Sequence, residues 1–63
     1  MSKIKEFRLQ NDFTQRYIAY KIGVSQQAVA KWENGISVPN ITHIIMLSQL
    51  MQCSASELVN AFK

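Results

Sequence analysis

The chain has 63 residues, of which 48% are hydrophobic, and a net charge of +3. This length fits one small domain over residues 1–63, and the apolar content excludes a disordered tail. The single cysteine excludes an intrachain disulfide and a cysteine-based zinc site, and it suits a reducing cytoplasm. No apolar run is long enough for a signal peptide or a membrane span, so we expect a cytoplasmic protein with no membrane partner. The mild basic excess permits nucleic-acid binding.

Two short helices are predicted in the first third of the chain, which contains few glycines or prolines to interrupt them. Ser2 can cap the first helix, which runs to about Gln10. Thr14 can cap the second, which runs to Ile22 and ends at Gly23, a residue that readily takes the left-handed conformation at a helix end.

Three further helices are predicted in the rest of the chain. Ser25 caps the third, which stops at the Asn-Gly sequence of residues 34–35. Asn40 caps the fourth, in which a mostly apolar set of residues recurs at helical spacing; they are Ile41, Ile44, Ile45, Ser48 and Met51. Ser54 and Glu57 form an S-x-x-E capping box at the start of a short fifth helix. No segment reads as a strand, so the predicted fold class is all-α.

The turn between the second and third helices has the spacing of a helix-turn-helix. Ala19 is small, which lets the third helix approach the second closely, and Gly23 takes the turn. Val24 follows into the core, and Val29 and Trp32 bury the inner side of the third helix.

This spacing lies within a longer segment, FTQRYIAYKIGVSQQAVAKWENGISVPN, which resembles the signature of the Cro/CI-type (Xre-type) family of phage and bacterial repressors. The shared features are Thr-Gln at the second helix, Gly-Val-Ser at the turn, Trp-Glu-Asn-Gly after the third helix and a proline before the fourth. The resemblance extends from about Ile4 to Leu58. It implies a compact, lambda-repressor-like bundle of about five helices and binding to double-stranded DNA.

The start of the third helix is predicted to contact base edges. With about 100° between successive residues and Val29 directed at the core, a set of polar or small residues points outward. Gln26 lies to the side, but on the first turn, which is the part of a recognition helix that reaches the bases. Glutamine can form two hydrogen bonds with adenine; the alternative is that both glutamines are ordinary surface residues. The predicted base contacts are Gln26, Gln27, Ala30 and Lys31.

The DNA backbone is expected to lie against the start of the second helix and the turn after the third. A helix N-terminus favours an anion near Gln15, and in the resembled family this glutamine and the asparagine of the Glu-Asn-Gly turn, here Asn34, commonly contact phosphates. Gly35 allows close backbone approach, and Ser37 offers a hydroxyl. The remaining candidates, which could equally be solvated, are Arg16 and Lys21.

Glu33 falls on the inward side of the third helix, where an unpaired carboxylate would be costly. Arg8 leans toward the apolar side of the first helix, so we expect the two to form a structural pair, as recurs in the resembled family. The alternative is a solvated pair worth under about 1 kcal/mol.

No residue pattern indicates catalysis, a metal site or a cofactor. His43 stands alone, expected on the outer face of the fourth helix, with no ligand at metal spacing. Cys53 is expected to be a buried, inert thiol. Gln52 stands where the resembled family usually has glycine or asparagine. The sequence therefore does not define the cap geometry at the end of the fourth helix.

The leading interpretation is a sequence-specific transcriptional regulator, a repressor that binds a near-palindromic operator as a homodimer. Met46 and Leu50 are expected to point outward from the fourth helix as a candidate partner surface, together with Val59 and Phe62. Two alternatives stay open: an antitoxin that represses its own operon and holds a toxin, and a helical protein-interaction module that does not bind DNA.

Overall fold

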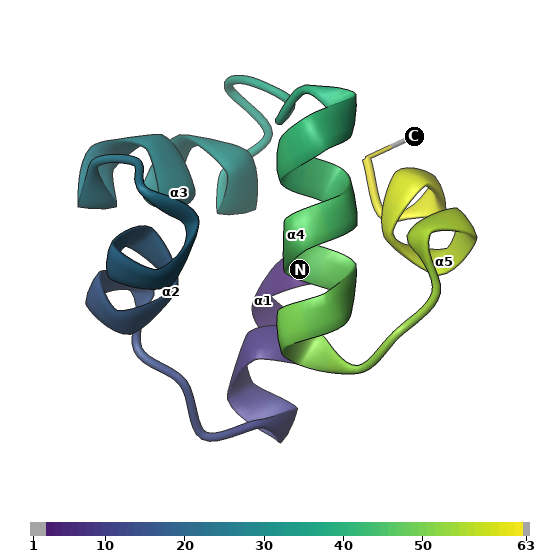
Figure 1. The fold of residues 1–63 in the computed structure, drawn as a ribbon. Helices are drawn as coiled ribbons and strands as arrows, with labels where there is room; N and C mark the ends of the chain where they lie inside the picture. The colour runs from purple at the N-terminus through teal and green to yellow at the C-terminus, as the bar shows by residue number, and fades with distance from the viewer. Residues whose placement is uncertain (1–2, 63) are drawn as a thin grey trace.

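Five α-helices follow one another through residues 3–62, the part of the chain that the computed structural model describes (Figure 1). They are α1 (Lys3–Gln10), α2 (Gln15–Ile22), α3 (Gln26–Glu33), α4 (Ile41–Met51) and α5 (Ala55–Asn60). No strand occurs among these residues. The predicted all-α bundle of about five helices is confirmed.

Four of the helices begin at the predicted caps, where a polar side chain accepts a hydrogen bond from the backbone N–H three residues later. These bonds are 2.8–3.1 Å long, and the capping side chains are Thr14, Ser25, Asn40 and Ser54. At α5 the bond is reciprocated by Glu57, which completes the predicted capping box. Ser2, the expected cap of α1, lies outside the described residues.

Two helices end in the left-handed conformation. Gly23 closes α2 with φ of 84°, and its N–H donates to the carbonyl of Ala19. Gln52 closes α4 in the same way with φ of 56°, so a glutamine here takes the geometry that glycine or asparagine usually takes. The Asn11 side chain donates a hydrogen bond of 3.2 Å to the carbonyl of Met51. This bond gives a partner to one of the carbonyls at the C-terminal end of α4, which cannot bond within the helix.

The core forms around α4, which runs between the α2–α3 pair and α5 in Figure 1. Ala19, Val29 and Trp32 are buried, and Val24 packs against them, as the predicted helix-turn-helix requires. The buried apolar residues are Ile4, Ile18, Ala19, Ile22, Val29, Trp32, Ile44, Leu47, Met51 and Leu58. None of the described helices has the length and apolar character that crossing a membrane requires.

Two of the residues that follow the helical spacing of α4 are exposed. Ile44 and Met51 are buried as predicted, but Ile41 and Ile45 face solvent. The helix is apolar around most of its circumference, so periodicity alone does not define its inner side. Packing against α2 and α5 decides it, and the direction of Leu47 marks the core.

Candidate nucleic-acid interface

The helix-turn-helix consists of α2, a turn at residues 23–25, and α3, which cross steeply in Figure 1. Both Gly23 and Val24 donate backbone hydrogen bonds to the carbonyl of Ala19, at 2.9 and 3.0 Å. These two hydrogen bonds to one carbonyl fix the direction in which the chain leaves α2. Ser25 then caps α3 at once, so the turn has little freedom.

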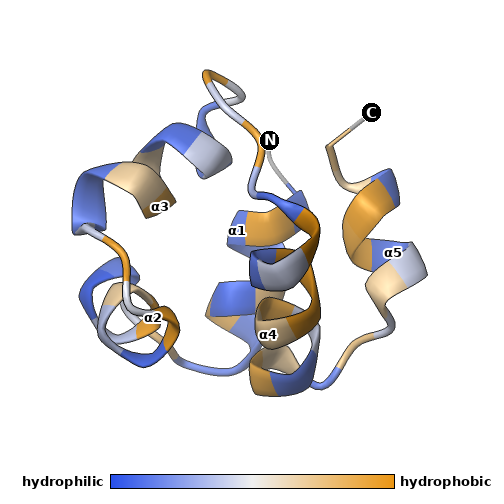
Figure 2. Ribbon diagram, turned by 45° about the horizontal axis from the view of Figure 1, so that its top comes forward, coloured by the Kyte–Doolittle hydropathy of each residue, from blue (hydrophilic) through white to orange (hydrophobic). Residues whose placement is uncertain are grey.

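One side of α3 is buried and the other is polar and open. Val29 and Trp32 lie in the core, while the predicted base-contacting residues lie on the other side. Of those four, Gln26, Gln27 and Lys31 are exposed and Ala30 is partly buried. Figure 2 shows hydrophilic residues over much of α2 and α3, in contrast to the largely hydrophobic α4.

The starts of α2 and α3 together form a polar hollow. Its volume is about 350 Å³, and Gln15, Gln26, Gln27 and Ala30 line it. The structure therefore brings one predicted phosphate contact together with three predicted base contacts. The lining has donors and acceptors but no charged side chain, and the small Ala30 leaves space between the glutamines.

A buried ion pair lies behind this hollow. Arg8 Nε lies 2.6 Å from Glu33 Oε2, and Arg8 Nη2 donates to Glu33 Oε1 at 3.1 Å. The remaining Arg8 nitrogen, Nη1, donates to the carbonyl of Phe13 at 2.9 Å. Arg8 and Glu33, which were expected to pair, thus form a bidentate ion pair that connects α1 to the end of α3.

Sequence reasoning missed that Gln15 belongs to the same network. Gln15 Nε2 donates to Glu33 Oε1 at 3.0 Å. A carboxylate engaged by an arginine only accepts hydrogen bonds, so this contact fixes which end of the Gln15 amide faces Glu33. The second N–H and the oxygen of the amide are left for other partners. The available signal was that one arginine cannot fill every acceptor position of a buried carboxylate.

The other predicted phosphate contacts lie at two separate places. Asn34 and Gly35 are exposed at the end of α3, and Ser37 follows them, partly buried. Gly35 has φ of 72°, and a Cβ there would meet nothing within 4 Å. The requirement for glycine is therefore conformational.

Arg16 and Lys21 lie on α2, but toward opposite ends. Arg16 is exposed beside Gln15. Lys21 lies in the last turn, and its Nζ is 5.9 Å from the centre of the Tyr17 ring. Five residues of α-helix separate the two by roughly 7.5 Å along the axis, so Lys21 is not part of the hollow around Gln15.

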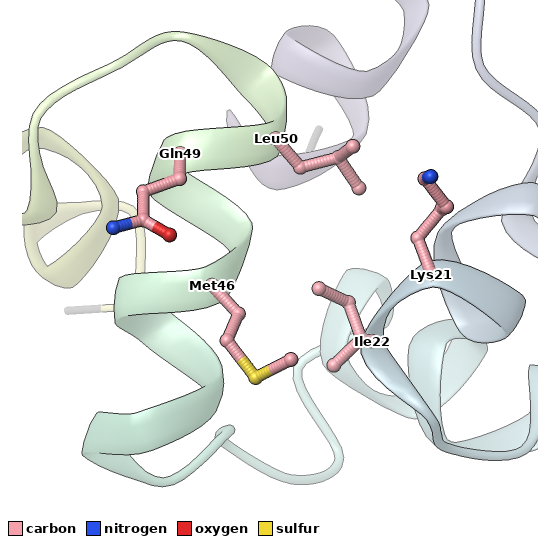
Figure 3. Close-up of a pocket in the computed structure, with 5 residues that line it drawn as sticks. All are labelled: Lys21, Ile22, Met46, Gln49 and Leu50. Atoms are coloured by element: carbon pink, nitrogen blue, oxygen red, sulfur yellow. The ribbon is translucent and has the colours of Figure 1, made fainter.

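Met46 and Leu50 do not point freely outward, and this expectation was wrong. Both are partly buried against the core. With Lys21, Ile22 and Gln49 they line an open groove of about 320 Å³. Figure 3 shows the Met46 and Leu50 side chains reaching from α4 toward the end of α2. They face α2 because the core direction of α4 lies nearer to them than the helical spacing suggested.

The isolated histidine and cysteine are also placed. His43 is partly buried, with its ring 5.8 Å from that of Trp32, so it packs near α3 and is not on the outer face of α4 as expected. Burial raises the pKa of the Cys53 thiol, and the charge of Glu57 raises it further. Within residues 3–62, no three His, Cys, Asp or Glu side chains gather where they could hold a metal ion.

Comparison with known proteins agrees with this architecture. A helix-turn-helix family model matches residues 4–58. The chain is similar to the HTH-type transcriptional activator BcrR of Enterococcus faecalis, with 29% identity over 58 residues, which cover 92% of this chain and 28% of the relative. It therefore spans less than a third of that relative's length. No solved structure matches the chain significantly. The match over residues 4–58, together with the five-helix bundle, shows that the chain belongs to the Cro/CI-type (Xre-type) helix-turn-helix family, whose members bind DNA in transcription regulation.

Proposed function

We propose that this chain regulates transcription by binding a specific double-stranded DNA sequence, with the first turn of α3 in the major groove. The observation that carries the proposal is the uncharged hollow lined by Gln15, Gln26 and Gln27. The amides of Gln26 and Gln27 suit base edges, which present a pattern of donors and acceptors, while the neighbouring Gln15 amide suits a phosphate. A purely electrostatic DNA surface would instead be lined by cations.

The proposed contacts of this interface fall into two groups, those to base edges and those to phosphates. Gln26 and Gln27 pair with adenine edges, and Ala30 contacts a thymine methyl group. Lys31 contacts a guanine edge in the same groove. The proposed phosphate contacts, which position the chain without reading the sequence, are Gln15, Arg16, Lys21, Asn34, Gly35 and Ser37.

We further propose that the chain acts as a repressor and binds a near-palindromic operator as a homodimer. One copy offers a single cation on α3, Lys31, so its sequence-independent attraction to DNA is weak. Specific regulators reach dissociation constants of about 10⁻⁸ M or lower. Two copies on half-sites roughly 34 Å apart would supply that affinity.

Activation of transcription is the second candidate. The observation in its favour is that BcrR, to which the chain is similar, is named a transcriptional activator. The DNA contacts proposed above serve either outcome, since the position of the bound site relative to a promoter decides between them. A reporter gene placed downstream of the selected site distinguishes the two by the sign of the change in expression.

Selection of bound sequences from a random double-stranded pool, followed by titration with variants, tests the DNA interface. Gln26→Ala and Gln27→Ala should each weaken binding to the selected site by about 1–3 kcal/mol and relax preference at one base position. Gln10→Ala is the matched control, because Gln10 is an exposed helical glutamine on α1. If neither variant differs from the control, α3 does not read the bases.

A further inference from the structure

A long central part of the chain carries no charged side chain. None of the seven basic and four acidic residues lies within residues 34–56, the stretch that separates Glu33 from Glu57. This uncharged stretch includes the loop after α3, the whole of α4 and the start of α5. In a chain with a net charge of +3, it is the part that a like-charged molecule could approach without repulsion.

Of the six large aliphatic side chains that are exposed within residues 3–62, four lie in this uncharged stretch. Ile36 and Val38 are 71% and 61% exposed in the loop that leads into α4, and Ile41 and Ile45 are 64% and 46% exposed on α4. Ile41 and Ile45 are one helical turn apart, so they lie on the same side of the helix. We call these four residues the apolar strip. Single exposed apolar side chains are ordinary, but four of them within residues 36–45, with no charged residue in that segment, indicate a contact surface.

We propose that the apolar strip is the surface on which a second copy of this chain docks. An uncharged apolar surface is complementary to itself, as the two-fold contact of a homodimer requires. An acidic or basic partner would gain nothing from charge here. The groove beside Met46 and Leu50, the surface first expected to pair, is less suited to this contact, because both side chains are partly buried against the core of their own copy.

The position of the strip fits the DNA-binding role, on which this inference rests. It begins directly after α3: the N–H of Ile36 donates to the carbonyl of Lys31 at 2.9 Å. A second copy that docks on the strip therefore places its own α3 in the neighbourhood of the first. Two recognition helices held in this way suit adjacent half-sites of one operator.

The size of the strip predicts when pairing occurs. Four aliphatic side chains exposed to this degree present only a few hundred Å². A standard stable interface buries about 800 Å² on each partner. The pair is thus too weak to persist in dilute solution, and it forms when DNA brings two copies together, which appears as cooperative binding.

The double variant Ile41→Gln/Ile45→Gln tests the strip without changing the net charge or weakening the helix. Its control is Leu9→Gln, since Leu9 is 51% exposed on α1, outside the uncharged stretch. Each protein is titrated against DNA with one selected half-site and with both, and circular dichroism checks the fold. The double variant should lose at least about tenfold in affinity for the full site and keep the half-site affinity, while the control keeps both.

Two results would overturn the inference: full-site binding by the double variant as cooperative as that of the parent, or independent half-site binding by the parent. The second would leave the strip to another part of a longer chain or to a different protein. If the parent binds no DNA at all, the proposed function fails, but the strip remains testable by sedimentation equilibrium at high concentration. The parent should then self-associate and the double variant should not; a parent that stays monomeric refutes docking of a second copy.

Discussion

Replacing Arg8 by alanine should remove most of the stability of this protein. The Arg8 side chain is only 11% exposed and that of Glu33 only 4%, so water cannot replace the lost contacts at the carboxylate. The change deletes both bonds to Glu33 and the bond to the Phe13 carbonyl. It leaves Gln15 as the only described side chain that donates to Glu33.

The expected loss is about 3–5 kcal/mol, the usual cost of removing one partner of a buried ion pair. A chain of this size has a net stability of roughly 3–5 kcal/mol, so the Arg8→Ala protein should be substantially unfolded at 25 °C. A second variant, Arg8→Met/Glu33→Leu, removes both charges and keeps apolar volume. It should recover much of the loss, because a buried pair can often be replaced by packed apolar residues at little cost.

Urea denaturation followed by circular dichroism measures both effects. The control is Arg16→Ala, because Arg16 is an exposed arginine on α2 and its removal should change the free energy of unfolding by no more than about 0.5 kcal/mol. Equal midpoints for the Arg8→Ala and Arg16→Ala proteins would refute the view that the pair is buried and structural.

Three other experiments test separate parts of the structure. Gln52→Gly should raise the free energy of unfolding by up to about 1 kcal/mol, because the left-handed conformation strains a residue with a side chain; an unchanged or lower melting temperature contradicts this. Since burial and Glu57 raise the pKa of the Cys53 thiol, iodoacetamide should modify the folded protein at neutral pH more slowly than the urea-unfolded one, and equal rates would count against it. Arg16→Ala, at a proposed phosphate contact, should reduce the slope of log affinity against log salt by about 1, whereas Gln27→Ala should leave it unchanged; identical slopes for both would place Arg16 away from the DNA backbone.

Most of the fold follows from local signals in the sequence. The caps at Thr14, Ser25 and Asn40 are predictable because a short polar side chain before an apolar-periodic run satisfies a free backbone N–H at the helix start. Gly23 is predictable because the turn requires a left-handed residue. The Arg8–Glu33 pair is predictable in kind, since an inward carboxylate requires a partner.

The details that sequence reasoning missed depend on contacts between helices. Met46 and Leu50 lie on the α2 side of α4, and Ile45 on the solvent side, because neighbouring helices and not the apolar period set the direction of a helix that is apolar nearly all round. The contact between Gln15 and Glu33 joins residues 18 apart in the sequence. It depends on how α2 and α3 cross, which no local pattern specifies.

The shared carboxylate of Glu33 connects the stability of the core to the proposed binding of DNA. Glu33 lies on α3 and accepts hydrogen bonds from Arg8 of α1 and Gln15 of α2, so one buried group positions three helices. The Gln15 amide, which lines the hollow beside Gln26 and Gln27, is thereby oriented from behind by the core. A polar group held in this way loses less conformational entropy when it meets DNA than a free surface side chain does. Substitutions at Arg8 should therefore weaken DNA binding even in the molecules that remain folded, although Arg8 itself is buried away from the surface that we propose to face DNA.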